Sequence, residues 1–130
     1  MVNLDTIFGE SAGKIWTTLY EEEVSPESRL KKKTKLKDHE FYGAIGWLAR
    51  ENKIRKDGKA LTLGETNLTP EIGRNAGRVW KALNIWEELT DEDLVELTDL
   101  NKKDLFSALG WLAREDKVEF DPATEKWKLK

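Results

Sequence analysis

The chain contains the same six-residue segment, Gly-Trp-Leu-Ala-Arg-Glu, at residues 46–51 and again at residues 110–115. The two segments are 64 residues apart, and the same shift aligns Ala12–Trp16 with Ala76–Trp80 without a gap. Six identical residues in the same order rarely recur by chance in a chain of 130 residues. The sequence therefore predicts two tandem copies of one structural unit.

The repeat places the boundary between the copies near the middle of the chain. We assign residues 1–63 to unit 1 and residues 72–130 to unit 2, joined by a polar, aperiodic linker over residues 64–71. Each unit has about 60 residues, which is near the lower limit at which one hydrophobic core stabilises a domain. We therefore expect the two units to pack against each other.

Hydrophobic periodicity predicts the elements of unit 1, because helices show apolar residues at i, i+3, i+4 and i+7 and strands show alternation. Three helices and a hairpin are expected near residues 10–23, 26–33, 39–52 and 54–63. Ser25 as N-cap and Pro26 as the first helical residue predict the start of the second helix. Asp38 is the expected N-cap of the third helix.

Unit 2 repeats this order of elements. Its first helix is expected from about residue 72, its second after Thr90, its third after Asn101, and its hairpin over residues 118–129. Asp93, three residues after Thr90, resembles a capping box. The two units together predict an α+β fold that is mainly α.

Three helices followed by a β-hairpin are typical of a winged helix-turn-helix domain. The sequence also resembles a winged helix family of bacteria and archaea that has long been catalogued as a domain of unknown function. The resemblance rests on stretches that occur in both copies, Ser11–Trp16 with Asn75–Trp80 and Ala44–Lys53 with Ala108–Lys117. It implies a tandem pair of winged helices and, by analogy within the family, DNA binding. Fold alone does not establish function.

The two halves of the chain differ in charge. Residues 1–64 carry 12 Lys or Arg and 10 Asp or Glu, whereas residues 65–130 carry 10 and 15. The second helix and hairpin of a winged helix approach the phosphates of a duplex. We therefore predict phosphate contacts from the basic residues of these two regions in unit 1, which are Arg29, Lys31, Lys32, Lys33, Lys35, Lys37, Arg55, Lys56 and Lys59. The alternative is a solvated lysine-rich surface without a ligand. Lys33 aligns with Leu97, which we expect to be a core position.

The third helix of unit 1 carries further candidates. The face opposite its apolar stripe is expected to present His39, Gly43, Gly46 and Arg50 to solvent. Candidate contacts to bases or phosphates on this helix are His39, Tyr42 and Arg50. However, Gly46 and Arg50 recur as Gly110 and Arg114 in the acidic copy. This recurrence favours a packing role for Gly46, Trp47 and Arg50, with nucleic-acid contact as the alternative.

The six tryptophans could suggest base stacking, as in proteins that bind single strands. Five of them occupy matched or core-facing positions and are expected in the core: Trp16, Trp47, Trp80, Trp111 and Trp127. Trp86 aligns with Glu22 and has no aromatic counterpart. It is therefore the candidate contact between the two units or with a protein partner.

The inventory of reactive side chains is small. The chain has no cysteine and a single histidine, His39, and its carboxylates are not combined with a metal motif or a phosphate-binding loop. We therefore expect no enzymatic activity, no metal and no cofactor. No apolar run approaches the roughly 20 residues needed to cross a bilayer. The N-terminus lacks the pattern of a secretory signal, so we expect a cytoplasmic protein without membrane association.

These patterns favour a DNA-binding, transcription-related function in which unit 1 contacts double-stranded DNA and unit 2 supports it. A second interpretation is a protein-interaction adaptor, because unit 2 is acidic and carries Trp86. The sequence defines neither a specific DNA site nor the oligomeric state.

Overall fold

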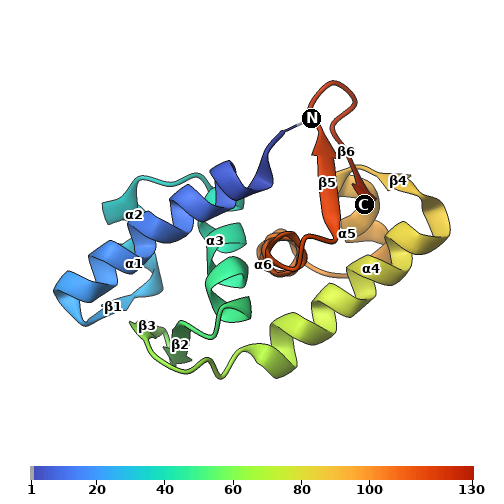
Figure 1. The fold of residues 1–130 in the computed structure, drawn as a ribbon. Coiled ribbons are helices and arrows are strands. Elements are labelled where there is room, and N and C mark those ends of the chain that lie inside the picture. Colours follow the sequence, from blue (N-terminus) through green and yellow to red (C-terminus); the bar gives the residue numbers. More distant parts are fainter. Residues whose placement is uncertain (1) are drawn as a thin grey trace.

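A computed structural model describes residues 2–130, and both units have the same order of elements (Figure 1). Unit 1 consists of η1 (Asp5–Gly9), α1 (Glu10–Glu22), β1 (Val24–Pro26), α2 (Glu27–Thr34), α3 (Asp38–Arg50), β2 (Ile54–Asp57) and β3 (Ala60–Leu63). Unit 2 consists of η2 (Thr69–Gly73), α4 (Arg74–Trp86), β4 (Glu88–Leu89), α5 (Asp91–Thr98), α6 (Lys102–Arg114), β5 (Val118–Asp121) and β6 (Lys126–Leu129). The predicted α+β, mainly helical fold of two tandem copies is confirmed.

Each unit also contains a short strand before its second helix, which the periodicity did not reveal. The sheets have the orders β1-β3-β2 and β4-β6-β5, and all their pairs are antiparallel. Ser25 lies in β1 opposite Leu61, so the prediction that it caps the second helix is wrong. Its buried hydroxyl donates to the carbonyl oxygen of Pro26 at 3.2 Å, and α2 begins at Glu27. A strand of three residues is too short to show alternation.

The helix starts of unit 2 agree with the sequence. Thr90 Oγ1 accepts a hydrogen bond from Asp93 N at 3.2 Å, and Asp93 Oδ2 accepts one from Thr90 N at 3.1 Å. Asn101 Oδ1 accepts a hydrogen bond from the backbone N–H of Asp104 at 2.8 Å. These bonds satisfy N–H groups that have no partner within the helix. In unit 1, Asp38 is the first helical residue, one position later than its expected role as N-cap.

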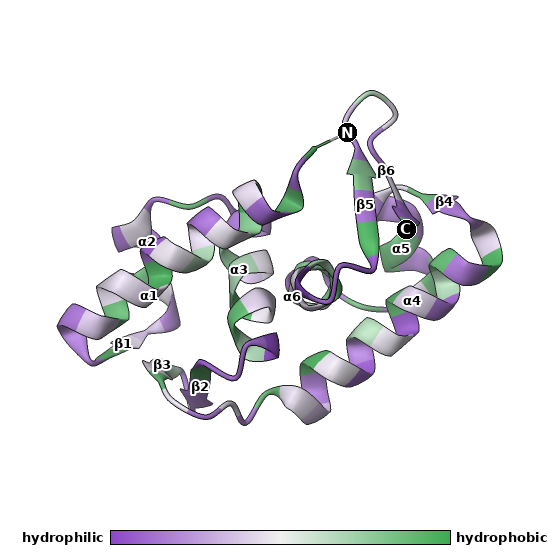
Figure 2. Cartoon of the chain, in the orientation of Figure 1, coloured by the Kyte–Doolittle hydropathy of each residue, from purple (hydrophilic) through white to green (hydrophobic). Residues whose placement is uncertain are grey.

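The hydrophobic core of each unit lies between its first helix, its third helix and its sheet. Fully buried side chains in the two cores include Ile15, Leu19, Phe41, Ile54, Leu83, Leu105, Leu109 and Val118. Figure 2 shows apolar residues on α3 at the centre, whereas polar and apolar residues alternate around the turns of α1 and α4. The first helices therefore cover the cores and present their polar faces to solvent.

The two units meet at α3 and α6, which cross at the centre of the molecule with α1 on one side and α4 on the other (Figure 1). Gly43 and Gly46 are buried in this contact, so the expectation that they face solvent is wrong. A Cβ on Gly46 would lie 2.7 Å from the carbonyl carbon of Ser107, and one on Gly110 would lie 2.8 Å from Gly43 Cα. The two helix backbones therefore touch, and glycine is required where they do.

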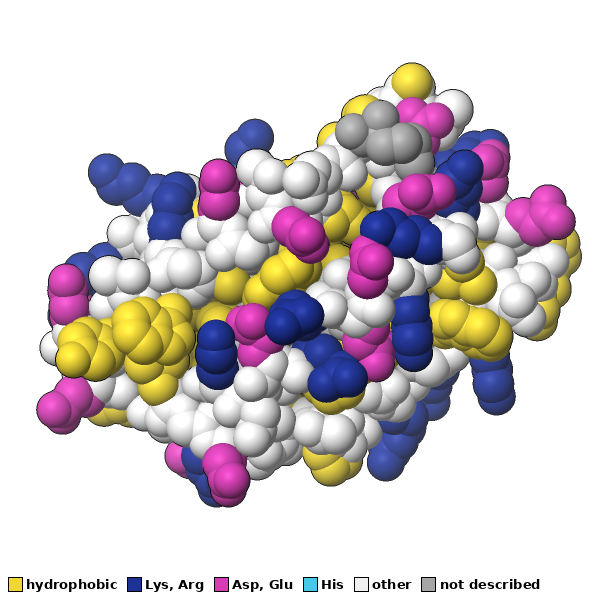
Figure 3. Space-filling view, in the orientation of Figure 1, with side chains coloured by type: hydrophobic (Ala, Val, Ile, Leu, Met, Phe, Trp, Pro, Cys, Tyr) yellow, Lys and Arg dark blue, Asp and Glu magenta, His cyan; other side chains and the backbone are white. Residues whose placement is uncertain are grey.

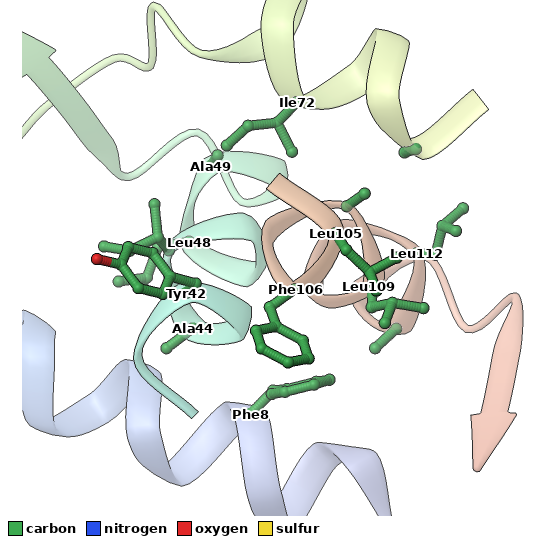
Figure 4. Close-up of a cluster of buried hydrophobic side chains, with 14 of the residues drawn as sticks. Phe8, Tyr42, Ala44, Leu48, Ala49, Ile72, Leu105, Phe106, Leu109 and Leu112 are labelled. Atoms are coloured by element: carbon green, nitrogen blue, oxygen red, sulfur yellow. The ribbon is translucent and has the colours of Figure 1, made fainter. Parts of the chain in front are cut away.

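Aromatic side chains fill one side of this crossing. A Cβ on Gly43 would lie 2.6 Å from Cδ1 of Phe8, so the absence of a side chain at Gly43 makes room for that ring. Figure 4 shows Phe8 beside Phe106, and Ile72 on the opposite side of the α3 and α6 pair. Phe8 is buried and also stacks on Trp127, with ring centroids 6.5 Å apart. The N-terminal turn of unit 1 therefore packs on unit 2.

Several expectations about burial are wrong. Trp16 and Trp80 lie on the edges of α1 and α4 and are 40% and 39% exposed, so they are not core residues. Leu97 is 47% exposed, and the aligned Lys33 therefore replaces a surface leucine rather than a core one. Trp127 is buried as expected. In the first helix of each unit, the apolar stripe predicted from residue spacing therefore includes one tryptophan that lies outside the core.

Candidate nucleic-acid interface

The basic segment Arg29–Lys37 comprises most of α2 and the turn that follows it. Six of its nine residues are Lys or Arg. The helix ends because Lys35 adopts a left-handed backbone conformation (φ 57°), and its N–H donates to the carbonyl oxygens of Lys31 and Lys32. Cations in the last turn of a helix are favoured by the helix dipole. Figure 3 shows Lys and Arg side chains projecting from the end of unit 1 where α2 lies.

Half of these cations pair with carboxylates of the same unit. Arg29 Nη2 lies 3.6 Å from Glu22 Oε1, and Lys33 pairs with the same carboxylate. Lys31 pairs with Asp38. Hydrogen bonds from these lysines lower the pKa of Glu22 and of Asp38. Within residues 2–130, no carboxylate lies at ion-pair distance from the other three ammonium groups, which belong to the exposed residues Lys32, Lys35 and Lys37.

The hairpin cations lie beside the opposite end of α2. The carbonyl oxygen of Lys59 accepts a hydrogen bond from Glu27 N at 2.9 Å. Lys56 Nζ lies 3.4 Å from Glu27 Oε1, and Arg55 Nε lies 3.2 Å from Asp57 Oδ1. An eight-residue helix is about 12 Å long, so Lys35 and Lys37 lie at the other end of α2 from the hairpin cations, and Arg29 lies between them.

The third-helix candidates are placed differently from the basic segment. Tyr42 is buried at the junction of the units, and its hydroxyl donates to Glu27 Oε2 at 3.2 Å. Burial and the Glu27 carboxylate raise the pKa of Tyr42 to about 12. His39 is exposed and lies edge-on to Phe106, with centroids 6.1 Å apart. Of these two side chains, only that of His39 is open to a ligand.

Arg50 belongs to a symmetric set of contacts between the repeated hexapeptides. Its Nε lies 3.2 Å from Glu115 Oε2, and the equivalent Arg114 Nε lies 3.1 Å from Glu51 Oε2. Each guanidinium also lies 5.6 Å from the ring centroid of a tryptophan in the other unit, Trp111 for Arg50 and Trp47 for Arg114. The hexapeptide therefore joins the units through a pseudo-twofold arrangement. This supports the packing role that the recurrence favours.

We expect the Arg50→Ala substitution to destabilise the folded protein by about 1 kcal/mol, since it removes one exposed ion pair and one cation–π contact. A double-mutant cycle with Glu115→Ala, followed by urea denaturation, measures the coupling between the two side chains. The matched control is Arg55→Ala, which breaks the local pair with Asp57 in the hairpin and should cost less. Equal effects at the two arginines would contradict the contact between units.

The arrangement of three helices and a three-stranded sheet in each unit agrees with the family comparison. The sequence profile of the winged helix-turn-helix domain (DUF2582) matches residues 4–63 and again residues 66–130. The chain belongs to this winged helix-turn-helix family. It contains two copies of the winged helix domain in tandem. The comparisons found no match among curated proteins and none among solved structures.

In this tandem winged helix protein the third helices do not face outward. In a DNA-bound helix-turn-helix domain this helix enters the major groove. Here α3 and α6 pack against each other through direct backbone contact, so each covers the other. The exposed cationic surface of unit 1 lies on α2, on the turn after it and on the hairpin.

The second winged helix has different surface chemistry. The positions that align with the basic segment, residues 93–101, contain no Lys or Arg. Trp86, at the end of α4, is 59% exposed and lines an open groove of about 570 Å³ with Glu87, Glu88 and Lys128. Trp86 does not lie in the contact between the units. Of the two roles expected for it, contact with a protein partner therefore remains.

The described part of the chain contains neither a group of three or more side chains arranged to hold a metal ion nor a helix long and apolar enough to cross a membrane. One surface feature was missed by the sequence reasoning. Trp16 and Tyr20 stack with centroids 5.1 Å apart, and both are exposed. Figure 3 shows this apolar patch over the far end of α1. The i, i+4 spacing of the two rings could have indicated it.

Proposed function

We propose that the protein binds double-stranded DNA through the phosphate backbone, using the basic segment Arg29–Lys37 with support from the hairpin cations of unit 1. The observation that carries this proposal is the contrast between the units. Six of the nine residues in this segment are basic, and all six are exposed or partly exposed, whereas the aligned positions of unit 2 carry no Lys or Arg. Lysine and arginine side chains that neutralise phosphates supply most of the affinity of sequence-independent binding.

The burial of α3 determines the mode of binding. Base readout requires side chains on the recognition helix to reach the floor of the major groove. Tyr42 is buried, and Arg50 is engaged with Glu115 and Trp111. Of the three candidates on this helix only His39 is open to a ligand. The proposed complex therefore relies on phosphate contacts from the basic segment, and it leaves the α3 and α6 contact intact. A transcription-related role would follow from binding of this kind rather than from recognition of one operator.

Salt dependence tests the proposal. If the six cations of the basic segment each neutralise one phosphate, the slope of log K against log salt should be about −5 for duplex DNA. The measurement is a fluorescence-anisotropy titration of an unrelated-sequence duplex at several salt concentrations. Binding that is absent at 50 mM salt, or that has a slope near zero, would sink the proposal.

A second function is favoured by the exposed indole of Trp86 and the acidic residues around it. In this alternative, unit 2 docks a protein, and unit 1 provides the scaffold that holds it. Affinity capture with the full chain distinguishes the two functions. A partner that is retained by Lys32→Glu and lost by Trp86→Ala would support the adaptor, and retention by both variants would contradict it.

A further inference from the structure

A small cavity lies at the junction of the two units, between α3 and the hairpin of unit 1 and η2 and α6 of unit 2. Its volume is about 180 Å³. Its apolar wall is formed by Tyr42, Ile45, Leu61, Leu68 and Ile72. Its polar lining is formed by Glu27, Lys56, Glu71, Lys103 and Asp104. Because residues of both units line this cavity, it exists only when the two winged helices are docked.

The cavity is the place where the pseudo-twofold symmetry of the molecule fails. The shift of 64 residues relates Ile72 to Phe8, Tyr42 to Phe106 and Lys56 to Phe120. In the hairpin of unit 1, Leu61 pairs with Lys56, and in the hairpin of unit 2, Trp127 pairs with Phe120. Leu61 and Trp127 therefore occupy equivalent positions.

The related place on the other side of the crossing is filled by the rings of those four aromatic residues. Phe120 and Trp127 have centroids 4.8 Å apart, Trp127 stacks on Phe8, and Phe8 lies beside Phe106 in Figure 4. The cavity is therefore the space that the rings of Phe8, Phe120 and Trp127 occupy in the symmetric position, whereas Tyr42 retains the ring that corresponds to Phe106.

The polar lining carries more negative than positive charge. Lys56 Nζ is 3.4 Å from Glu27 Oε1, and Lys103 Nζ lies 5.5 Å from the ring centroid of Tyr42. Within the described residues, the carboxylates of Glu71 and Asp104 have no cation at ion-pair distance. Three carboxylates thus face two ammonium groups, and one of those ammonium groups is already paired.

We propose that this cavity binds a small aromatic amine, with its ring against Ile45, Leu61 and Ile72 and its ammonium group toward Asp104 and Glu71. The volume is suitable, because an apolar cavity of about 150 Å³ in another protein accommodates benzene. The ring replaces the aromatic packing present on the symmetric side, and the ammonium group balances the excess of carboxylates. The ligand contacts both units and therefore stabilises their docked arrangement.

Titration of the full chain with 2-phenylethylamine, followed by ¹H–¹⁵N correlation spectra, tests the proposal. We expect saturable shifts at the amides of Ile45, Ile72 and Ser107. Phenylacetate, which has the same ring with the opposite charge, and n-butylamine, which has the charge without the ring, should each bind at least tenfold more weakly. Equal binding of either compound, shifts located elsewhere, or no shift at 10 mM 2-phenylethylamine would overturn the assignment.

Two variants provide independent controls. The double substitution Ile72→Phe/Ser107→Gly copies the Phe8 and Gly43 pair and fills the cavity, so it should abolish binding without lowering the melting temperature. Asp104→Asn leaves the cavity open and should weaken 2-phenylethylamine binding at least fivefold, whereas it should not weaken the binding of phenylacetate, which has no ammonium group. Unaltered affinity in Asp104→Asn would contradict the proposal even if the double variant does not fold.

Discussion

Replacing Gly46 or Gly110 with alanine should destabilise the folded protein by about 3 kcal/mol, which is the upper part of the usual range for overpacking. The added Cβ at Gly46 would lie 2.7 Å from the backbone carbonyl carbon of Ser107, and the one at Gly110 would lie 2.6 Å from that of Gly43. Backbone atoms cannot rotate away as a flexible side chain can. The helices must therefore separate, which exposes apolar surface on both sides of the crossing.

Thermal denaturation measures this effect, and a loss of about 3 kcal/mol corresponds to a decrease in melting temperature of roughly 10 °C for a chain of this size. The matched controls are Gly13→Ala in α1 and Gly77→Ala in α4, where a Cβ would meet nothing within 4 Å. Because alanine has the higher helix propensity, both should gain up to about 1 kcal/mol. A Gly46→Ala protein as stable as the controls would show that α3 and α6 are not in backbone contact.

The triple substitution Lys32→Glu/Lys35→Glu/Lys37→Glu should reduce DNA affinity on the order of 10³-fold at 50 mM salt. Each phosphate contact contributes about 0.9 to the salt slope, which amounts to roughly 15-fold per contact at that concentration. The slope should decrease in magnitude from about −5 to about −3. These three lysines are exposed and have no carboxylate at ion-pair distance within residues 2–130, so their replacement leaves the internal ion pairs of unit 1 in place.

The control for this variant changes the net charge by the same amount on unit 2. Lys81→Glu/Lys102→Glu/Lys126→Glu should reduce affinity by less than tenfold, since charges far from the duplex are largely screened beyond about 10 Å at 0.1 M salt. Anisotropy titrations at matched salt concentrations compare the two variants. Equal losses would show that net charge, rather than the basic segment, governs binding.

Much of the fold could be predicted from the sequence because the signals are local. Helix periodicity, the capping box at Thr90 and the Asn101 cap all act within a few residues, and the periodicity of the first and third helices occurs in both copies. Strand β1 was not predicted because its pairing with β3 is long-range and it spans three residues. The burial of Gly43 was not predicted because a face that is polar or glycine-rich appears solvent-exposed until a second unit covers it.

The candidate site could be predicted only in part, for a similar reason. The excess of lysine over residues 29–37 is a property of composition and is visible in the sequence. Which of those cations form ion pairs within the protein depends on carboxylates in other elements, such as Glu22 for Lys33. The junction cavity exists partly because unit 2 has Ile72 where unit 1 has Phe8. The sequence shows this difference, but only the structure shows that it leaves a cavity between the units.

An NMR titration of the full chain with a short duplex distinguishes binding through the basic segment from binding through the third helices, since it reports both surfaces in one measurement. We expect shifts at the amides of residues 29–37, with smaller ones at 55–59. We expect none beyond the baseline at 43–50 and 107–114, because α3 and α6 remain packed against each other. Shifts centred on 43–50 or 107–114, with residues 29–37 unaffected, would show instead that the units open to present their third helices to DNA.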